Sequence, residues 1–192
     1  MSKVHESIDP TLRAWIDAQH LFFVATAPLD PAGHVNLSPR GGAGTFRVID
    51  EHTVCWLDLT GSGAETIAHL RDNGRVTVMF CAFEGPPKIV RLHGRGRVVL
   101  PSDDGWQDLV GGFPPKPGAR AVIVVDVTRV SDSCGYSVPF FDYVGERDLL
   151  DRWAENRGED GLVDYRATRN ATSIDGLPAL DPFGEPAPSR SP

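Results

Sequence analysis

Residues 54–83 read VCWLDLTGSGAETIAHLRDNGRVTVMFCAF, and this stretch predicts a strand, a turn, a short helix and a second strand. The apolar run 54–57 ends before the glycine-rich turn 60–63, because glycine weakens strands and favours turns. Apolar residues then recur at helical spacing as far as the Asn-Gly pair 73–74, which is typical of a helix C-terminus. From Val76 onward every second residue is apolar, which indicates a strand.

The turn is a candidate binding site formed by Thr60, Gly61, Ser62 and Gly63. A glycine-rich turn that opens a helix leaves backbone N–H groups free, and Thr60 and Ser62 add two hydroxyls. Together with the positive end of the helix dipole, these groups can cradle a phosphate. The same residues also fit a solvated turn in which Ser62 caps the helix, and the spacing alone leaves both interpretations open. The spacing matches neither GxGxxG nor GxxxxGK[ST], so it favours neither a Rossmann fold nor a P-loop.

The composition is that of an ordinary globular domain. The chain has 192 residues, 41% of them hydrophobic and 23% charged, which is enough for one buried core. A formal net charge of −7 argues against nucleic acid or an anionic membrane surface as a partner. The start carries no signal-peptide pattern, and no apolar run approaches about eighteen residues. We therefore expect a cytoplasmic protein with no membrane partner.

The cysteines and histidines predict no metal site. Cys55, Cys81 and Cys134 form no CxxC pair, and no two histidines have HExxH spacing. Cys55 and Cys81 fall in apolar strands, where cysteine behaves as a small core residue.

The remainder of the chain predicts further strands, joined mostly by short turns, with helices near both ends. Because these strands do not alternate with helices, the pattern predicts a mainly β fold with a six- to seven-stranded antiparallel barrel or sandwich. The expected strands are 21–26, 34–38, 46–48, 54–56, 76–82, 89–100 and 120–130, and the expected helices outside 54–83 are 10–19, 102–110 and 146–156.

The predicted domain spans residues 1–157, with an N-terminal helix and a C-terminal covering helix. From residue 158 onward helical and strand signals fade, so residues 158–192 are expected to form an extended tail. Its last ~10 residues are proline-rich and expected to be disordered.

A second candidate site is the SPRGG segment 38–42. Ser38 offers a hydroxyl, Arg40 a fixed cation with a bidentate fork, and Gly41 a pliable backbone, a set that suits an anion. A bulge that carries a surface arginine fits the same residues. A further basic set is spaced by two along the strand 89–100 and shares one face: Arg91, His93, Arg95 and Arg97. These residues can meet a phosphate or pair with the many carboxylates of an acidic chain.

The order of four motifs, FVATA, HVNLSPRGG, WLDLTGSGAETIAHLRDNGRVTVMF and IVRLHGRGRVV, resembles the pyridoxamine 5′-phosphate oxidase-like, FMN-binding split-barrel family. The resemblance covers residues 15–130. It implies a six-stranded antiparallel split barrel and a homodimer with FMN in a cleft at the dimer interface. It also implies that basic and hydroxyl groups from neighbouring strands and from the turn before the helix hold the FMN phosphate.

Residue by residue, Arg40 falls where the oxidases place a phosphate-binding lysine, and the turn 60–63 falls in the loop that approaches the phosphate. The cofactor-binding residues expected from the two segments and the basic strand are Ser38, Arg40, Gly41, Thr60, Gly61, Ser62, Gly63 and Arg91.

The chain also departs from the oxidase pattern. Glu65 and Thr66 stand where the oxidases have an Arg-Lys pair, and a glutamate there repels a phosphate. Val35 replaces an upstream strand arginine, and the substrate-binding C-terminal end is not recognisable. The resemblance therefore points to an uncharacterised subgroup rather than to a true pyridoxamine phosphate oxidase, with Arg91 or Arg95 supplying the missing positive charge.

The leading interpretation is an FMN-dependent oxidoreductase that works as a homodimer on a small-molecule substrate, with the flavin carrying the electrons. No side chain identifies itself as a general acid or base. One alternative is a reductase that uses a deazaflavin of the F420 type on the same barrel. Another is a flavin- or haem-binding protein without turnover, for which His34, His69 and His93 are the available haem ligands. A third is a domain that has lost cofactor binding through the replacement at residues 65–66.

Overall fold

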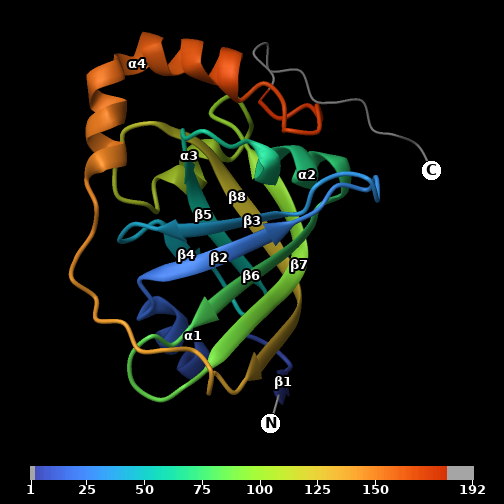
Figure 1. The fold of residues 1–192 in the computed structure, drawn as a ribbon, viewed down its shortest axis with the longest axis vertical. Helices are drawn as coiled ribbons and strands as arrows, with labels where there is room; N and C mark the ends of the chain where they lie inside the picture. The colour runs from blue at the N-terminus through green and yellow to red at the C-terminus, as the bar shows by residue number, and fades with distance from the viewer. Residues whose placement is uncertain (1–2, 181–192) are drawn as a thin grey trace.

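The fold is a strongly curled antiparallel sheet, described by a computed structural model over residues 3–180 (Figure 1). Seven strands lie in the order β3-β2-β6-β7-β8-β5-β4, and the short β1 pairs with β8. All pairs are antiparallel, so the predicted mainly β split barrel is confirmed. The strands are β1 Lys3–His5, β2 Leu21–Thr26, β3 Asn36–Gly41, β4 Phe46–Val48, β5 Thr53–Leu59, β6 Arg75–Cys81, β7 Ile89–Val99 and β8 Ala119–Ser133.

The curl of the sheet brings its two edges together around an aromatic core. Phe22 on β2 packs against Phe46 on β4 and Trp56 on β5, with ring centroids 4.9 and 5.9 Å apart, although these strands lie far apart in the sheet order. Phe80 completes the cluster, and Trp56 and Phe80 are at most 1% exposed. Burial of a large apolar side chain contributes about 1.5–3 kcal/mol, so this cluster contributes substantially to barrel closure.

The neighbouring strands β5 and β8 are largely apolar on both faces because two separate clusters cover them. The main core fills the barrel, and a smaller cluster packs under α3 (Trp106–Val110). The continuous apolar run VIVV in β8 reflects this double burial rather than a half-exposed strand. The members of the smaller cluster are Cys55, Leu57, Val99, Trp106, Phe113, Val122 and Val124.

Two helices begin and end much as the sequence predicts. Helix α1 (Pro10–Asp17) is capped by Asp9, whose carboxylate accepts a 2.7 Å hydrogen bond from the backbone N–H of Leu12. Helix α2 (Glu65–Asn73) ends at Gly74 in the left-handed conformation, with φ at 72°. The N-cap of α2 is Ala64, and no side chain within residues 3–180 caps the helix, so the interpretation of Ser62 as a helix cap is wrong.

Strand β3 continues through Pro39, Arg40 and Gly41, where the sequence pattern predicts a break. The proline is tolerated because β3 is an edge strand. Among the described strands it pairs with β2 alone, so the missing N–H of Pro39 removes no bond to a second neighbour. Arg40 consequently sits on a regular strand opposite Phe22 rather than in a bulge.

The prediction of an extended tail from residue 158 is wrong for the residues that directly follow. Helix α4 runs from Leu149 to Arg169 and is interrupted only at Gly158, where φ is 67° and ψ is 172°. The two arms of the helix pack through Trp153 and Tyr165, whose rings lie 5.0 Å apart. This contact forms only after the chain turns at the glycine, so local periodicity does not contain it. The predicted disorder of the last residues falls on 181–192, which lie outside the described residues.

After α4 the chain returns to the barrel. Ala179 and Leu180 are buried in the main core, and a bridge between Thr172 and Pro178 closes the returning segment. Figure 1 shows α4 crossing above the end of the barrel at which α2 lies. Across residues 3–180 no helix is both long enough and apolar enough to cross a bilayer.

Candidate functional site

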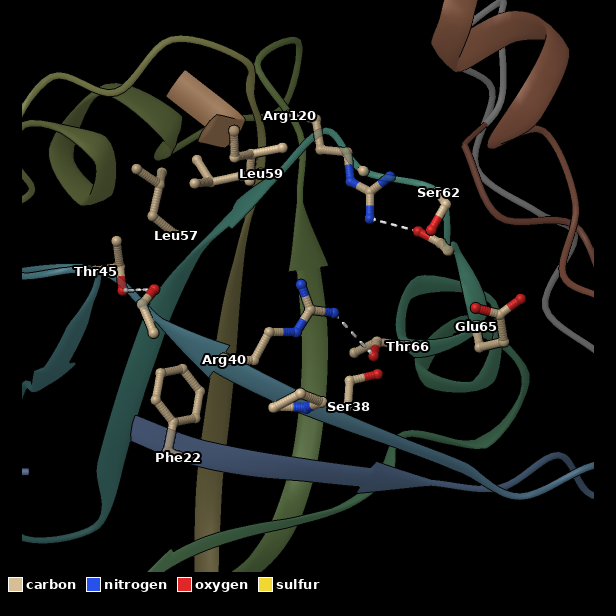
Figure 2. Close-up of a pocket in the computed structure, with 15 residues that line it drawn as sticks. Phe22, Ser38, Arg40, Thr45, Leu57, Leu59, Ser62, Glu65, Thr66 and Arg120 are labelled. Carbon is tan, nitrogen blue, oxygen red and sulfur yellow. Dashed lines mark hydrogen bonds between the residues drawn. The ribbon is translucent and has the colours of Figure 1, made fainter. Parts of the chain in front are cut away.

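A pocket of about 430 Å³ opens between the edge strand β3, the turn 60–63 and the start of α2 (Figure 2). Its volume falls in the range of about 300–1,000 Å³ that small-molecule sites occupy. Helix α4 contributes one side chain, Leu150, to its rim. The lining residues are Phe22, Ser38, Pro39, Arg40, Gly41, Thr45, Leu57, Leu59, Gly61, Ser62, Gly63, Glu65, Thr66, Arg120 and Leu150.

A buried carboxylate joins two arginines beside this pocket. Asp58 on β5 is completely buried; its Oδ1 lies 2.6 Å from Arg40 Nη1 and its Oδ2 lies 2.7 Å from Arg120 Nε. Burial alone raises the pKa of Asp58, but the charges and hydrogen bonds of Arg40 and Arg120 outweigh it and hold that pKa below its ordinary value. Two guanidinium cations therefore share one carboxylate, and the trio keeps a net positive charge.

A β-bulge explains why Arg120 faces Asp58. In the pairing of β5 with β8, Asp58 lies opposite Ala121 and Leu59 lies opposite Ala119, so Arg120 is the extra residue without a partner. A bulge re-aims the side chain of such a residue. Arg120 is 3% exposed and donates through Nη2 to the carbonyl of Gly63 at 2.7 Å and through Nη1 to Asn170 Oδ1 at 2.8 Å.

Arg40, which lines the pocket, has a buried donor that no described residue satisfies. Its Nη1 donates to Asp58 and its Nη2 donates to Thr66 Oγ1 at 3.3 Å. Its Nε is buried and has no partner among the described residues. A buried N–H group without an acceptor costs about 1–3 kcal/mol, so this atom indicates a site for an acceptor that the protein itself does not supply.

The turn presents further donors. Among the contacts within residues 3–180, the backbone N–H groups of Gly61, Ser62 and Gly63 donate no hydrogen bond. The carbonyls of Gly61 and Gly63 are both bound, to Asn170 Nδ2 at 2.9 Å and to Arg120 Nη2. The turn is thus held through its carbonyls while its N–H groups stay available to an anion, the arrangement predicted for a phosphate cradle.

Hydroxyl and amide groups extend the site along β3. Asn36 Nδ2 donates to Thr66 Oγ1 and to Thr26 Oγ1, each at 3.1 Å, and Ser38 Oγ donates to Asn36 Oδ1 at 2.7 Å. Thr66 Oγ1 therefore accepts from both Asn36 and Arg40, which leaves its own proton to donate. Since Ser38 uses its proton on Asn36, it offers a lone pair instead.

His69 lies at the inner end of this series of hydrogen bonds and is fully buried on α2. Its Nδ1 lies 3.0 Å from Thr26 Oγ1. Burial lowers the pKa of His69, against the smaller opposing effects of Asp175 and Glu65, so the imidazole is neutral at pH 7. The histidine acts here as a buried hydrogen-bond partner of Thr26.

Glu65 is the replacement, relative to the oxidase pattern, that most disfavours an anion. Its carboxylate has a partner that does not line the pocket. Its Oε1 accepts a 3.3 Å hydrogen bond from the backbone N–H of Ile174 in the returning C-terminal segment. As the first residue of α2 it also lies at the positive end of the helix dipole, where a carboxylate is stabilised.

The structure brings most of the expected residues together. Six of them line the pocket: Ser38, Arg40, Gly41, Gly61, Ser62 and Gly63. Thr60 is buried behind the turn, where its Oγ1 donates to the Gly118 carbonyl at 2.8 Å and accepts from Arg166 Nε at 2.9 Å. Arg91 does not line the pocket; it lies on β7 and donates to Ser133 Oγ at 3.0 Å.

Sequence reasoning missed Arg120, Asp58 and Asn170. A signal existed for the first two, because each is the one charged residue in an otherwise apolar strand segment, ARAVIVV or VCWLDL. A charged side chain at a position where the strand pattern predicts burial needs an opposite charge beside it. No local pattern marks Asn170.

The three histidines considered as haem ligands have partners or positions outside the pocket. His34 pairs with Asp175 at 2.7 Å, His93 Nδ1 lies 3.1 Å from Thr77 Oγ1, and His69 is buried on α2. None of the three lines the pocket formed by the described residues. Within residues 3–180 no cluster of three or more His, Cys, Asp or Glu side chains is arranged to hold a metal ion.

Comparison with known proteins agrees with this architecture. The family model of pyridoxamine 5′-phosphate oxidase matches residues 8–134. The pyridoxamine 5′-phosphate oxidase family protein ustO of Aspergillus flavus is 41% identical over 194 residues, which cover 92% of this chain and 77% of that protein.

The fold is also similar to that of HupZ from Group A Streptococcus. Crystal structures of its histidine-to-alanine variant and of a second HupZ chain have TM-scores of 0.52 and 0.50, at 21% and 22% sequence identity. They cover 66% and 64% of this chain and 99% and 91% of HupZ. At these identities the similarity concerns the fold alone. The family model and the fungal relative together show that this chain belongs to the pyridoxamine 5′-phosphate oxidase family.

Proposed function

We propose that the pocket binds the phosphate end of FMN and that the protein is a flavin-dependent oxidoreductase acting on a small molecule. The observation that carries the proposal is the buried, unpartnered Nε of Arg40, a residue that lines the pocket together with a turn whose three backbone N–H groups donate no hydrogen bond within residues 3–180. Charge-assisted hydrogen bonds of this kind suit a phosphate better than a neutral ligand.

The charge balance supports the same assignment. Asp58 neutralises only one of the two guanidiniums, so an anion near Arg40 restores neutrality in a largely buried site. Glu65 is the opposing charge, and one of its two oxygens is engaged by the backbone N–H of Ile174. Arg120 thus takes the role for which the sequence pattern suggested Arg91 or Arg95.

When bound, the isoalloxazine supplies the electron-transfer chemistry. The residues of this chain would bind and orient it. Arg40, Thr66 and the turn would donate to the phosphate, Ser38 would hold Asn36 against Thr66, and apolar side chains such as Leu150 would exclude water from the pocket. A phosphate held on rigid strand and helix ends fixes the position of the rings relative to a substrate.

A homodimer is part of the proposal. The segment 134–148, which runs along the outside of the barrel in Figure 1, exposes Tyr136, Phe140 and Val144 by 81%, 78% and 97%. Large apolar side chains exposed at this frequency within one short segment are typical of an interaction surface. A second copy that covers the segment would remove these side chains from water.

The test is an absorbance spectrum of the purified protein, followed by titration of the flavin-free protein with FMN and with riboflavin. The proposal expects flavin bands or FMN uptake, and tighter binding of FMN than of riboflavin, which lacks the phosphate. A Soret band would instead assign haem, and selective uptake of F420 would assign the deazaflavin alternative. A colourless protein that binds none of these ligands contradicts the proposal.

A further inference from the structure

The C-terminal segment 149–180 lies beyond the region that the family model matches, yet residues at both ends of α4 reach the site. Leu150 at the start of α4 lines the pocket, and Asn170 directly after α4 reaches the turn 60–63. Asn170 is completely buried although it is polar. A buried amide is expensive to place unless all of its groups are paired, so its partners are informative.

The side chain of Asn170 joins two parts of the site. Its Oδ1 accepts from Arg120 Nη1 at 2.8 Å, and its Nδ2 donates to the Gly61 carbonyl at 2.9 Å. Its backbone N–H donates to the Arg166 carbonyl and its carbonyl accepts from Leu180 N–H, each at 3.0 Å. Asn170 is thereby fixed by α4 and by the returning segment while it holds the turn and Arg120.

Arg166, one turn earlier on α4, acts on the same turn. Its Nε donates to Thr60 Oγ1 at 2.9 Å, and Thr60 in turn holds the Gly118 carbonyl. The C-terminal segment therefore fixes both ends of the short stretch from Thr60 to Gly61, whose glycine otherwise has broad conformational freedom.

We propose that residues 149–180 form part of the cofactor site. In this site Asn170 is a positioning residue for the groups that bind the phosphate of the cofactor. This inference rests on the proposed FMN function. Asn170 does not line the pocket; it acts through Gly61 and Arg120, whose orientation it sets before the ligand arrives. Preorganised donors bind an anion more tightly because the ordering cost is met during folding.

The role of Asn170 can be separated from general stabilisation. Asn170→Ala removes both hydrogen bonds, whereas the near-isosteric Asn170→Asp preserves the packing and the acceptor for Arg120 but turns a carboxylate oxygen toward the Gly61 carbonyl. The matched control is Asp175→Ala, in the same segment. Within residues 3–180 the side chain of Asp175 accepts hydrogen bonds from the N–H and Nδ1 of His34, at 2.8 and 2.7 Å, and makes no hydrogen bond to the turn 60–63.

Two measurements are made on the full chain. In the absence of ligand, hydrogen–deuterium exchange of the Thr60 amide, which donates to the Gly118 carbonyl at 2.7 Å beside Gly61, should accelerate in both Asn170 variants and stay at the wild-type rate in Asp175→Ala. In titrations, both Asn170 variants should bind FMN about tenfold more weakly than wild type, the scale of a lost hydrogen bond to a charged group, while their riboflavin affinity stays unchanged. Asp175→Ala should bind both ligands as wild type does.

The outcomes distinguish the two proposals. If wild type binds FMN and both Asn170 variants bind it equally well, Asn170 is no positioning residue and the proposed function stands. If the variants lose riboflavin and FMN affinity alike, the segment acts only through general stability, which also overturns the inference. If wild type itself binds no FMN, the proposed function fails. Should Asn170→Ala not fold, the near-isosteric Asn170→Asp decides.

Discussion

Arg40 and Arg120 bind the two oxygens of one buried carboxylate, at 2.6 and 2.7 Å from Asp58. Arg40 comes from the edge strand β3 and Arg120 from a bulge in β8, so the contact spans the split of the barrel. A buried ion pair contributes little net stability relative to an apolar replacement. Removal of one partner is nevertheless costly, because it leaves the remaining charges buried without a counter-charge. Asp58, Arg40 and Arg120 therefore have two roles: they link the edge strand β3 to β5 and β8, and they set the positive charge beside the pocket.

Asp58→Asn should destabilise the protein by about 3–5 kcal/mol, because it leaves Arg120 buried without its counter-charge. The free energy of unfolding in urea measures this loss. Asp126→Asn, an exposed position on the same sheet, is the control and should leave it unchanged. A loss at Asp58 no larger than at Asp126 would contradict the structural role of the trio.

The same carboxylate predicts a pH dependence. The folded-state pKa of Asp58 lies below its ordinary value of 3.8, so its stabilisation is fully present above that value and is lost as the pH falls through the lower folded pKa. Wild type should therefore lose stability below pH 3.8 more steeply than Asp58→Asn. The comparison is a series of urea unfolding curves on the acid side; parallel curves for the two proteins would show that Asp58 does not titrate in this way.

Arg40→Ala should weaken FMN binding by about 1.5–3 kcal/mol, because it removes a charged donor to the phosphate. Riboflavin affinity should change little, since riboflavin has no phosphate. The exposed Arg97 on β7 provides the control, and Arg97→Ala should bind both flavins normally. Equal FMN affinity in Arg40→Ala and wild type would remove Arg40 from the cofactor site.

Thr66→Val should lower FMN affinity by about 0.5–1.5 kcal/mol. The Thr66 hydroxyl accepts from Asn36 and Arg40, so its proton is free to donate to the phosphate, and valine lacks that donor. Thr66→Ser keeps the hydroxyl and should restore most of the affinity. Isothermal titration of the two variants separates hydrogen bonding from packing; a valine variant that binds as tightly as the serine variant assigns Thr66 no donor role.

Phe140→Asp should convert a dimer to a monomer, because it places a charge in the proposed apolar interface. Sedimentation velocity measures the change. Leu29, 60% exposed in the turn after β2, offers a control of similar exposure outside the segment 134–148, and Leu29→Asp should leave the dimer intact. A wild-type protein that sediments as a monomer contradicts the homodimer itself.

Much of this architecture is local and could be predicted. The strand, turn, helix and strand of residues 54–83 follow from apolar spacing and from the Asn-Gly pair that ends α2 in a left-handed glycine. The six pocket residues from β3 and the turn were likewise visible as two short polar and glycine-rich segments. Such signals work because capping, turn formation and strand alternation depend on neighbours within a few residues.

The sequence by itself thus determined the mainly β framework and the two segments that carry most of the pocket. Only the tertiary structure decided that Asp58 would join Arg40 to Arg120, that α4 would continue past Gly158, and that Asn170 would hold the turn. These contacts join residues 18, 62 and 109 positions apart for Arg40–Asp58, Asp58–Arg120 and Gly61–Asn170. Their partners are chosen by the curl of the sheet and by a bulge, which arise from packing of the whole barrel rather than from any local pattern.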